Sequence, residues 1–285
     1  MTATRPTFSA DLAAEWRAAV ALGRKELRIA RRYPMNLANE VLQPIYQFLL
    51  PSLLLGATFL VGGRAIGLEA ATGTADLPGY LFLGMIVGGL AGTAFWEIAF
   101  GFKRERDAGT LEPAWLTPTR PETMVIGRAI GGLIIGGAAS VVLIGIGWVV
   151  FGASFSAGAW LALPALLVAA MSMVGIGYLV AAAVLLMREP NFFVDATNFL
   201  FAMASGVAFP VLVIPGLVRW VAYLLPTTYA LDILRVTALG TIPIAPVPLL
   251  WLGLLATSLL SIWIGVVAFR ATERRLRVTG DLSQH

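Results

Sequence analysis

A stretch of 59 residues, Ala129–Met187, contains no Asp, Glu, Lys or Arg. As one straight helix it would measure about 88 Å at 1.5 Å per residue, whereas the hydrocarbon core of a bilayer is about 30 Å thick. Residues 152–158 include two glycines and two serines, which favour a tight turn. The stretch therefore predicts two membrane-spanning helices joined by this turn, and the chain is expected to be a polytopic membrane protein.

The composition argues against several kinds of functional site in this chain. The chain is 58% hydrophobic and 13% charged, whereas a soluble domain carries about 25% charged residues. It has no cysteine and a single histidine, His285, so we expect no disulfide and no metal site. Its two lysines, Lys25 and Lys103, do not follow glycine, so a Gly-Lys-Ser/Thr phosphate loop is absent. We therefore expect this chain to bind no cofactor and no ATP of its own.

Apolar segments of membrane-spanning length recur along the chain and predict an all-α fold with six transmembrane helices. We assign residues 36–269 to this six-span domain, residues 1–35 to an N-terminal helix and residues 270–285 to a tail. The six expected spans are Val41–Val61, Leu77–Phe102, Ile130–Phe151, Trp160–Met187, Phe192–Ile214 and Leu249–Phe269.

Residues 1–35 predict an amphipathic helix at the membrane interface. Apolar residues recur there at helical spacing, the cations fall mainly on the other face, and Pro34 ends the pattern. Trp16 would anchor the helix among the headgroups, with the cations facing anionic membrane lipid. A cytoplasmic helix packed on a partner is the alternative, and both arrangements can hold together.

The basic residues predict the orientation. With the N-terminus inside, 17 of the 20 Lys and Arg residues lie on the inner side, leaving Arg64, Arg219 and Arg235 outside. Such an asymmetry is typical of the positive-inside rule, so we expect both termini in the cytoplasm. The pI of about 9.8 is explained by these flanking cations and does not indicate nucleic-acid binding.

Residues 215–242, before the last span, predict two short helices that re-enter the outer leaflet. Pro226 can begin a helix and Gly240 stands where a C-cap would lie. Asp232 and Arg235 are three residues apart, so they can share a helix face and neutralise each other. Tyr229 lies between Pro226 and this pair on the same predicted helix.

The loop at 103–122 carries signals for a short surface helix. Gly109 permits a turn, and Thr110 can N-cap a helix over Leu111–Leu116. Thr119 and Glu122 have the spacing of a capping box that opens the third span. We therefore expect a short helix held at the membrane surface between two long spans.

The run Arg104–Glu112, followed by Thr117-Pro118, resembles the cytoplasmic loop of type-2 ATP-binding-cassette (ABC) exporter permeases. The six-span plan, the basic N-terminal helix and the Pro226–Arg235 segment are also similar to that family. The resemblance implies a coupling helix within Arg104–Leu116 that seats in a groove of an ATPase. The implied coupling residues are Arg104, Glu105, Arg106, Asp107, Gly109, Thr110, Leu111 and Glu112.

The same resemblance implies a permease subunit that is not itself an enzyme. Its partners would be an ABC ATPase subunit, which binds ATP and Mg, and a second permease copy or paralogue. The pair would export an amphiphile, of the drug, lipid-linked or polysaccharide type, by alternating access at a dimer interface. The implied location is the inner (plasma) membrane of a bacterium.

Polar residues within the spans are candidates for a translocation path. Glu97 can bind a cationic substrate group or a proton, or it can pair with a cation such as Arg128 and fix helix packing. Two amide-rich clusters begin spans one and five, where they either line an inward-facing cavity or reach the headgroups. They comprise Asn36, Asn39, Glu40, Gln43 and Gln47, and Asn191, Asp195 and Asn198.

Two other functional classes remain as alternatives. An ion-coupled secondary carrier usually shows inverted repeats and several buried ionisable groups, which we do not see. A membrane enzyme, such as one that processes lipid, is the second alternative. Intramembrane serine proteolysis would need an embedded histidine, which is absent, and an alcohol-phosphate transferase would need a spaced cluster of aspartates, whereas the spans hold only Asp195.

Overall fold

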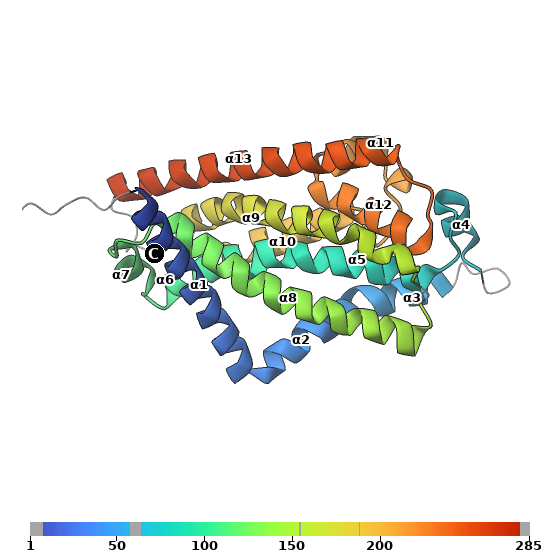
Figure 1. The fold of residues 1–285 in the computed structure, drawn as a ribbon, viewed down its shortest axis with the longest axis horizontal. Coiled ribbons are helices and arrows are strands. Elements are labelled where there is room, and N and C mark those ends of the chain that lie inside the picture. The colour runs from blue at the N-terminus through green and yellow to red at the C-terminus, as the bar shows by residue number, and fades with distance from the viewer. Residues whose placement is uncertain (1–7, 58–63, 154, 188, 280–285) are drawn as a thin grey trace, which may run out of the picture.

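The computed structural model describes residues 8–57, 64–153, 155–187 and 189–279, and within these ranges every regular element is a helix (Figure 1). The predicted all-α fold is therefore confirmed. The elements of the first half are α1 (Phe8–Arg32), α2 (Pro34–Pro44), the π-helix η1 (Ile45–Leu49), α3 (Leu50–Ala57), α4 (Ile66–Thr72), α5 (Leu77–Gly92), the π-helix η2 (Thr93–Ala99), α6 (Phe100–Asp107) and α7 (Leu111–Trp115). Those of the second half are α8 (Pro121–Phe151), the 3-10 helix η3 (Ala157–Ala162), α9 (Leu163–Leu186), α10 (Asn191–Ala204), the 3-10 helix η4 (Val211–Val213), α11 (Gly216–Leu224), α12 (Pro226–Leu239) and α13 (Val247–Thr279).

Four helical runs in the described ranges are long and apolar enough to cross a membrane: Leu77–Asp107, Pro121–Phe151, Ala157–Leu186 and Val247–Leu276. They lie along the long axis of the molecule (Figure 1), with α6 and α7 at one end and α4 and α11 at the other. We call these the α7 end and the α4 end. The apolar window of the α9 run is 67% buried, whereas that of α8 is 17% buried. The α9 run is therefore central, and α8 presents a broad apolar face to its surroundings.

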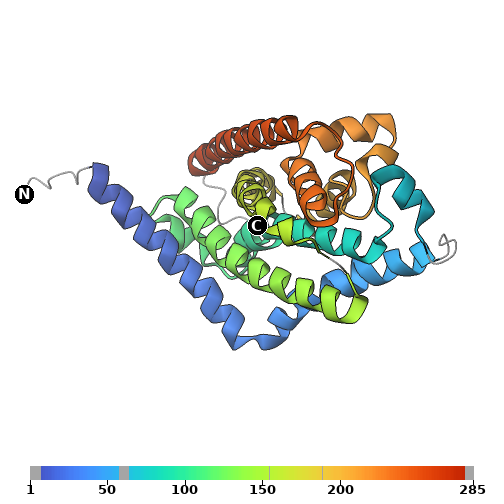
Figure 2. The ribbon, with the colours of Figure 1, turned by 45° about the vertical axis from the view of Figure 1, so that its right-hand side comes forward.

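The helices α9 and α13 form the most extensive packing in the fold, side by side in Figures 1 and 2. A Cβ atom added at Gly265 would strike the backbone carbonyl of Gly175, and one added at Gly175 would lie 2.5 Å from the amide nitrogen of Ile262. Small residues permit such close approach of two membrane helices. The absence of side chains at these two glycines therefore fixes how α9 and α13 cross.

Aromatic packing joins the same helices nearer the α7 end. The ring of Phe269 on α13 lies 5.8 Å from that of Phe102 on α6 and 5.3 Å from that of Tyr178 on α9. Phe102 and Phe269 are almost fully buried, and ring pairs at such distances contribute about 0.5–1.5 kcal/mol beyond burial. This cluster gives the α7 end a rigid base.

The N-terminal segment is a helix, as predicted, and it packs on its own chain. Ala19 and Gly23 of α1 are buried against α8, where a Cβ at Gly23 would meet Ile130 at 3.0 Å. Leu12 and Trp16 lie on the same face one and two turns nearer the N-terminus, and both are exposed. The apolar stripe of α1 is therefore covered by α8 at Ala19 and Gly23 and uncovered at Leu12 and Trp16.

The predicted first and fifth spans are not among the four long apolar helices. From Pro34 the chain is helical through Ala57, with a π-helical turn just after Pro44, whose missing N–H disturbs the hydrogen-bond ladder. The end of this predicted span, 58–61, lies outside the described residues, as does Arg188 of the charge count.

The prediction of one continuous helix over Phe192–Ile214 is wrong. The helix α10 ends at Ala204 after 14 residues, about 21 Å, and the chain turns at Gly206, whose φ is +80°. Pro210 then precedes the short η4. Glycine accepts this left-handed conformation at no steric cost, and proline cannot continue a helical ladder. The count of six spans therefore remains a prediction.

Several helices extend beyond the apolar segments that predicted them. The second span continues to Asp107, the third begins at Pro121, and α13 runs past Phe269 to Thr279. Ion pairs hold these polar extensions: Arg270 lies 3.0 Å from Glu122. The predicted tail at 270–285 is thus helical over its described part.

Candidate functional site

The connection between α6 and α7 is built around Gly109. Its φ of +66° is a left-handed conformation that favours glycine, and no atom lies within 4 Å of a Cβ added there. The Thr110 hydroxyl donates to the Glu105 carbonyl at 3.2 Å, and the Thr110 amide donates to the same carbonyl at 2.9 Å. Thr110 thus closes the end of α6. Thr110 is the N-cap residue of α7, as predicted, but its side chain makes no capping hydrogen bond there because the hydroxyl bonds back to α6.

The short helix α7 has one buried and one exposed face. Leu111 and Trp115 are buried in the core of the α7 end, whereas Leu116 has 82% of its surface exposed. Exposed polar and apolar residues surround Leu116 and form what we call the α7 surface, which consists of Asp107, Gly109, Thr110, Glu112, Pro113 and Leu116. Two buried anchors therefore hold a small protruding surface with an exposed leucine at its tip.

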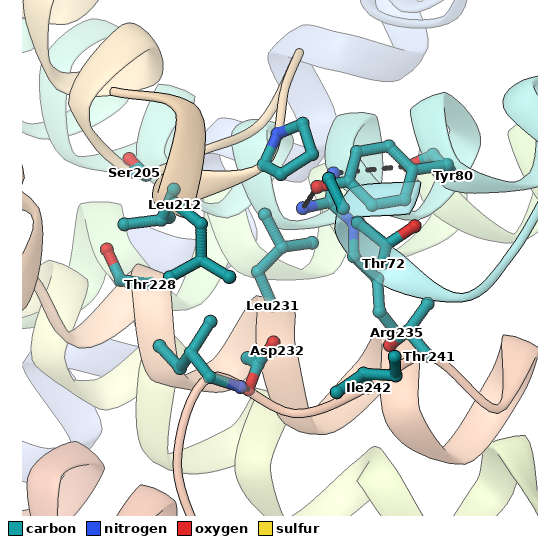
Figure 3. Close-up of a pocket in the computed structure, with 14 residues that line it drawn as sticks. Thr72, Tyr80, Ser205, Leu212, Thr228, Leu231, Asp232, Arg235, Thr241 and Ile242 are labelled. Carbon is teal, nitrogen blue, oxygen red and sulfur yellow. Dashed lines mark hydrogen bonds between the residues drawn. The ribbon is translucent and has the colours of Figure 1, made fainter. Parts of the chain in front are cut away.

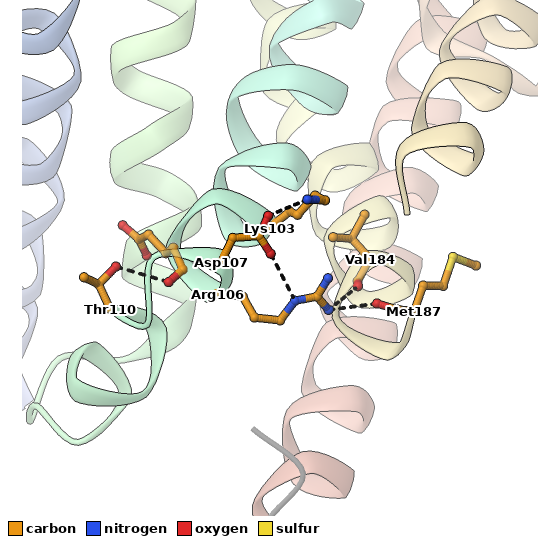
Figure 4. A network of polar contacts seen from close by, with 7 residues as sticks. Lys103, Arg106, Asp107, Thr110, Val184 and Met187 are labelled. Atoms are coloured by element: carbon orange, nitrogen blue, oxygen red, sulfur yellow. Dashed lines mark hydrogen bonds and ion pairs between the residues drawn. The ribbon is translucent and has the colours of Figure 1, made fainter. Parts of the chain in front are cut away.

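The two central charges of the predicted coupling segment point into the protein. Glu105 lies 2.6 Å from Arg128 of α8 and 3.1 Å from Lys25 of α1. Arg106 donates to the carbonyl of Met187 at 2.8 Å and to that of Val184 at 3.3 Å (Figure 4). Both side chains are therefore part of the base beneath the α7 surface, which their sequence positions did not reveal.

The same base includes α1. The carboxylate of Glu15 accepts hydrogen bonds from the amide of Arg120 and from the hydroxyl of Thr123, at the start of α8. The predicted capping box of Thr119 and Glu122 is wrong: Arg120 is the N-cap residue, and its side chain makes no capping bond. A carboxylate from a distant helix takes the place of the local cap, and no local spacing signals such a contact.

Glu97 pairs with a cation, as one of its two predicted roles has it, but the cation is Arg104 and not Arg128. Its carboxylate lies 3.5 Å from Arg104, while Arg128 pairs with Glu105 and stacks over the ring of Phe102 at 4.8 Å. The π-helical turn η2 carries Glu97. The negative charge of Glu97 is therefore offset by Arg104 of α6, the helix that directly follows η2.

The predicted path residues on α10 face outwards. Asn191 and Asp195 are exposed and Asn198 is half-buried. The two described cavities are lined by other residues. One is at the α4 end around Arg235, and the other is a crevice of about 410 Å³ that includes Tyr223, Tyr229 and Gly253.

The amides of α2 and η1 form a ladder along one helix face. The side chain of Asn39 donates to that of Gln43 at 3.4 Å, and Gln43 donates to Gln47 at 3.1 Å. All three are exposed or half-buried. Three of the five residues in the cluster predicted at the start of the first span are thus joined in one polar stripe.

The segment 215–242 forms two short helices, as its sequence predicts. Pro226 begins α12, and Gly240 ends it with φ +67°. The hydroxyl of Tyr229 donates to the carbonyl of Tyr223 at 2.7 Å, which ties α12 to α11.

The predicted neutralisation of Asp232 by Arg235 is not a direct ion pair. Asp232 accepts from the amide of Ile244 at 3.0 Å. Arg235 is almost fully buried, stacks over the ring of Tyr80 at 3.4 Å and donates to its hydroxyl at 2.8 Å (Figure 3). It also donates to the carbonyls of Gly206 and Val207, both at 2.9 Å. Arg235 therefore fastens α12 to α5 and to the turn after α10.

Within the described ranges, no group of three or more His, Cys, Asp or Glu side chains is placed to hold a metal ion. A search of curated proteins found no match to the chain. The family described as ABC-2 type transporter matches residues 17–239, a range that includes the larger part of α1, the α6–α7 connection and α12. The chain therefore belongs to the ABC-2 type transporter family.

Proposed function

We propose that this chain is the membrane subunit of an ATP-driven exporter and that the α7 surface is where its ATPase docks. Membership of the ABC-2 family supports an ABC permease, which is a transport subunit rather than an enzyme. The observation that carries the docking proposal is the exposed tip of α7, Leu116, above the buried anchors Leu111 and Trp115. Because its neighbours are already fixed by buried contacts, this surface loses little conformational freedom when a partner binds, which favours its use as a docking site.

The base under the α7 surface supports its use as a lever. Glu105 joins α6 to α8 and α1, and Arg106 joins α6 to the end of α9. A displacement of α7 by a moving ATPase would therefore reach three long helices through short, charge-assisted contacts. ATP and Mg are assigned to the partner subunit, and both termini to the cytoplasmic side with the α7 end.

We further propose that two copies, or this chain and a paralogue, enclose the path of an amphiphilic substrate. The amide ladder of Asn39, Gln43 and Gln47 supports this, because polar side chains are costly against lipid and favour a protein or aqueous neighbour. Glu97, Asn191, Asp195 and Asn198 remain candidates for the path. A drug, a lipid-linked sugar or a polysaccharide-type molecule fits a path that is polar on one side and apolar on the other.

The test is ATP-dependent transport in sealed vesicles that contain the chain and a co-expressed ABC ATPase. The variant Leu116→Ser removes the tip of the α7 surface, and Leu217→Ser removes a leucine with 87% exposure at the α4 end. We expect Leu116→Ser to lose transport and substrate-stimulated ATPase activity, and Leu217→Ser to keep both. Equal activity of the two variants would contradict docking at α7, and transport driven by an ion gradient without ATPase would favour a carrier.

A further inference from the structure

A small cavity lies at the α4 end, where five parts of the chain meet. It is bounded by α4, α5, the turn after α10, the helix α12 and the segment that follows α12, and it measures about 20 Å³ (Figure 3). A cavity needs about 10–15 Å³ of this kind of volume to hold one water molecule. The space therefore suits a single water and no larger ligand.

Two residues that line this cavity each carry a buried polar group without a hydrogen-bond partner in the protein. These groups are the Nε–H of Arg235 and the hydroxyl of Thr241, in side chains whose residues are 4% and 5% exposed. The other guanidinium nitrogens of Arg235 are all bonded, to Tyr80, Gly206 and Val207. A buried donor left without a partner costs about 1–3 kcal/mol. Two such groups at one cavity indicate that something occupies it.

The carboxylate of Asp232 lines the same cavity and has acceptor capacity left. One of its oxygens, Oδ2, accepts from the amide of Ile244. A carboxylate offers about four acceptor positions on its two oxygens, so the other oxygen can take a further donor. The residues around the cavity therefore offer one unused donor, the Nε–H of Arg235, and one unused acceptor, the second carboxylate oxygen of Asp232. The hydroxyl of Thr241 can donate or accept a hydrogen bond.

We propose that a single tightly bound water occupies this cavity and joins Asp232, Arg235 and Thr241. The water accepts from the Nε–H of Arg235, donates to the carboxylate of Asp232 and exchanges a hydrogen bond with the Thr241 hydroxyl. Buried waters typically make about three hydrogen bonds to groups that are otherwise unsatisfied. The charges of Arg235 and Asp232 offset each other, so a neutral ligand fits better than an ion.

The water completes a set of contacts that holds the α4 end of the molecule together. The amide of Ile242 donates to the carbonyl of Thr72 at 2.8 Å, which already ties the segment after α12 to α4. With the water in place, Arg235 and Asp232 of α12 are also joined to Thr241 of that segment. The ion pair predicted from the sequence is thereby formed through a water instead of directly.

X-ray radiolysis tests this proposal, because hydroxyl radicals formed from a bound water modify side chains next to it even when they are buried. In the intact protein in lipid nanodiscs we expect modification of Tyr80 and Leu231, which line the cavity and are 2% and 1% exposed. Phe82, which is 0% exposed and does not line the cavity, is the internal reference and should remain at background.

The variant Thr241→Val removes one partner of the water at nearly constant side-chain volume. The matched control is Thr237→Val on α12, whose hydroxyl donates within its own helix to Ile233 and Leu234. We expect Thr241→Val to lose the modification of Tyr80 and Leu231 down to the Phe82 level, and Thr237→Val to keep it. Background modification in the unaltered protein, or equal modification in both variants, would overturn the proposal.

Discussion

Replacing Glu105 by alanine should destabilise the fold, although this residue lies within a segment that the sequence presents as an exposed loop. The side chain of Arg128 is 6% exposed and lies 2.6 Å from the Glu105 carboxylate, whose own side chain is 18% exposed. Removing one partner of a buried ion pair costs about 3–5 kcal/mol, because the other charge is left uncompensated. Since Glu105 retains some contact with water, we expect about 3 kcal/mol, the lower end of that range.

The free energy of unfolding of each variant can be measured in bicelles by steric trapping. Lys25→Ala is the control, because Lys25 contacts the same carboxylate from an exposed position, and exposed pairs contribute about 0–1 kcal/mol. In a double-mutant cycle with Arg128→Met, the two substitutions should couple by about 1–3 kcal/mol. A loss below about 0.5 kcal/mol for Glu105→Ala would show that this reasoning about a buried ion pair is wrong.

Four further outcomes follow from the geometry. Gly265→Ala should cost about 1–3 kcal/mol by overpacking against Gly175, whereas Gly145→Ala, where a Cβ meets open space, should be neutral or stabilising; thermal unfolding of both variants distinguishes them. Arg235→Lys should lower the unfolding midpoint, since an ammonium group cannot reproduce the forked contacts of a guanidinium, and an unchanged midpoint would refute this role. Gly109→Val should leave the buried core intact and reduce ATPase affinity, because valine resists positive φ, and unchanged affinity in a binding assay would contradict it. The purified chain alone should show no ATP binding by calorimetry, as it lacks a phosphate loop, and stoichiometric binding would disprove this.

Much of the helical plan could be predicted from the sequence. The uncharged stretch and its glycine turn predicted α8 and α9, and Gly240 predicted the end of α12. These features depend on hydrophobicity and backbone conformation, which are set by residues that are neighbours in the sequence. The helical ends were less accurate, because ion pairs extend α6 and α13 beyond their apolar segments.

The contacts of the candidate site could not be predicted in the same way. Glu15 caps α8 although it lies 105 residues before Arg120 in the sequence. Glu105 of α6 forms an ion pair with Arg128 of α8. Spacing along the chain predicts neighbours on one helix, such as Asp232 and Arg235, but not which side chains from separate helices meet. The inward direction of Glu105 depends on tertiary packing alone.

The most direct test of the central claim is a cross-linking measurement between this chain and an ABC ATPase. The chain has no cysteine, so single cysteines placed by Leu116→Cys and, as a control, Leu217→Cys are unique reaction sites. With a short thiol-to-amine cross-linker and an ABC ATPase that forms a complex with this chain, we expect a cross-linked product from position 116 and none from position 217. Cross-linking from position 217 alone, or from neither position while the two proteins still form a complex, would contradict docking on the α7 surface.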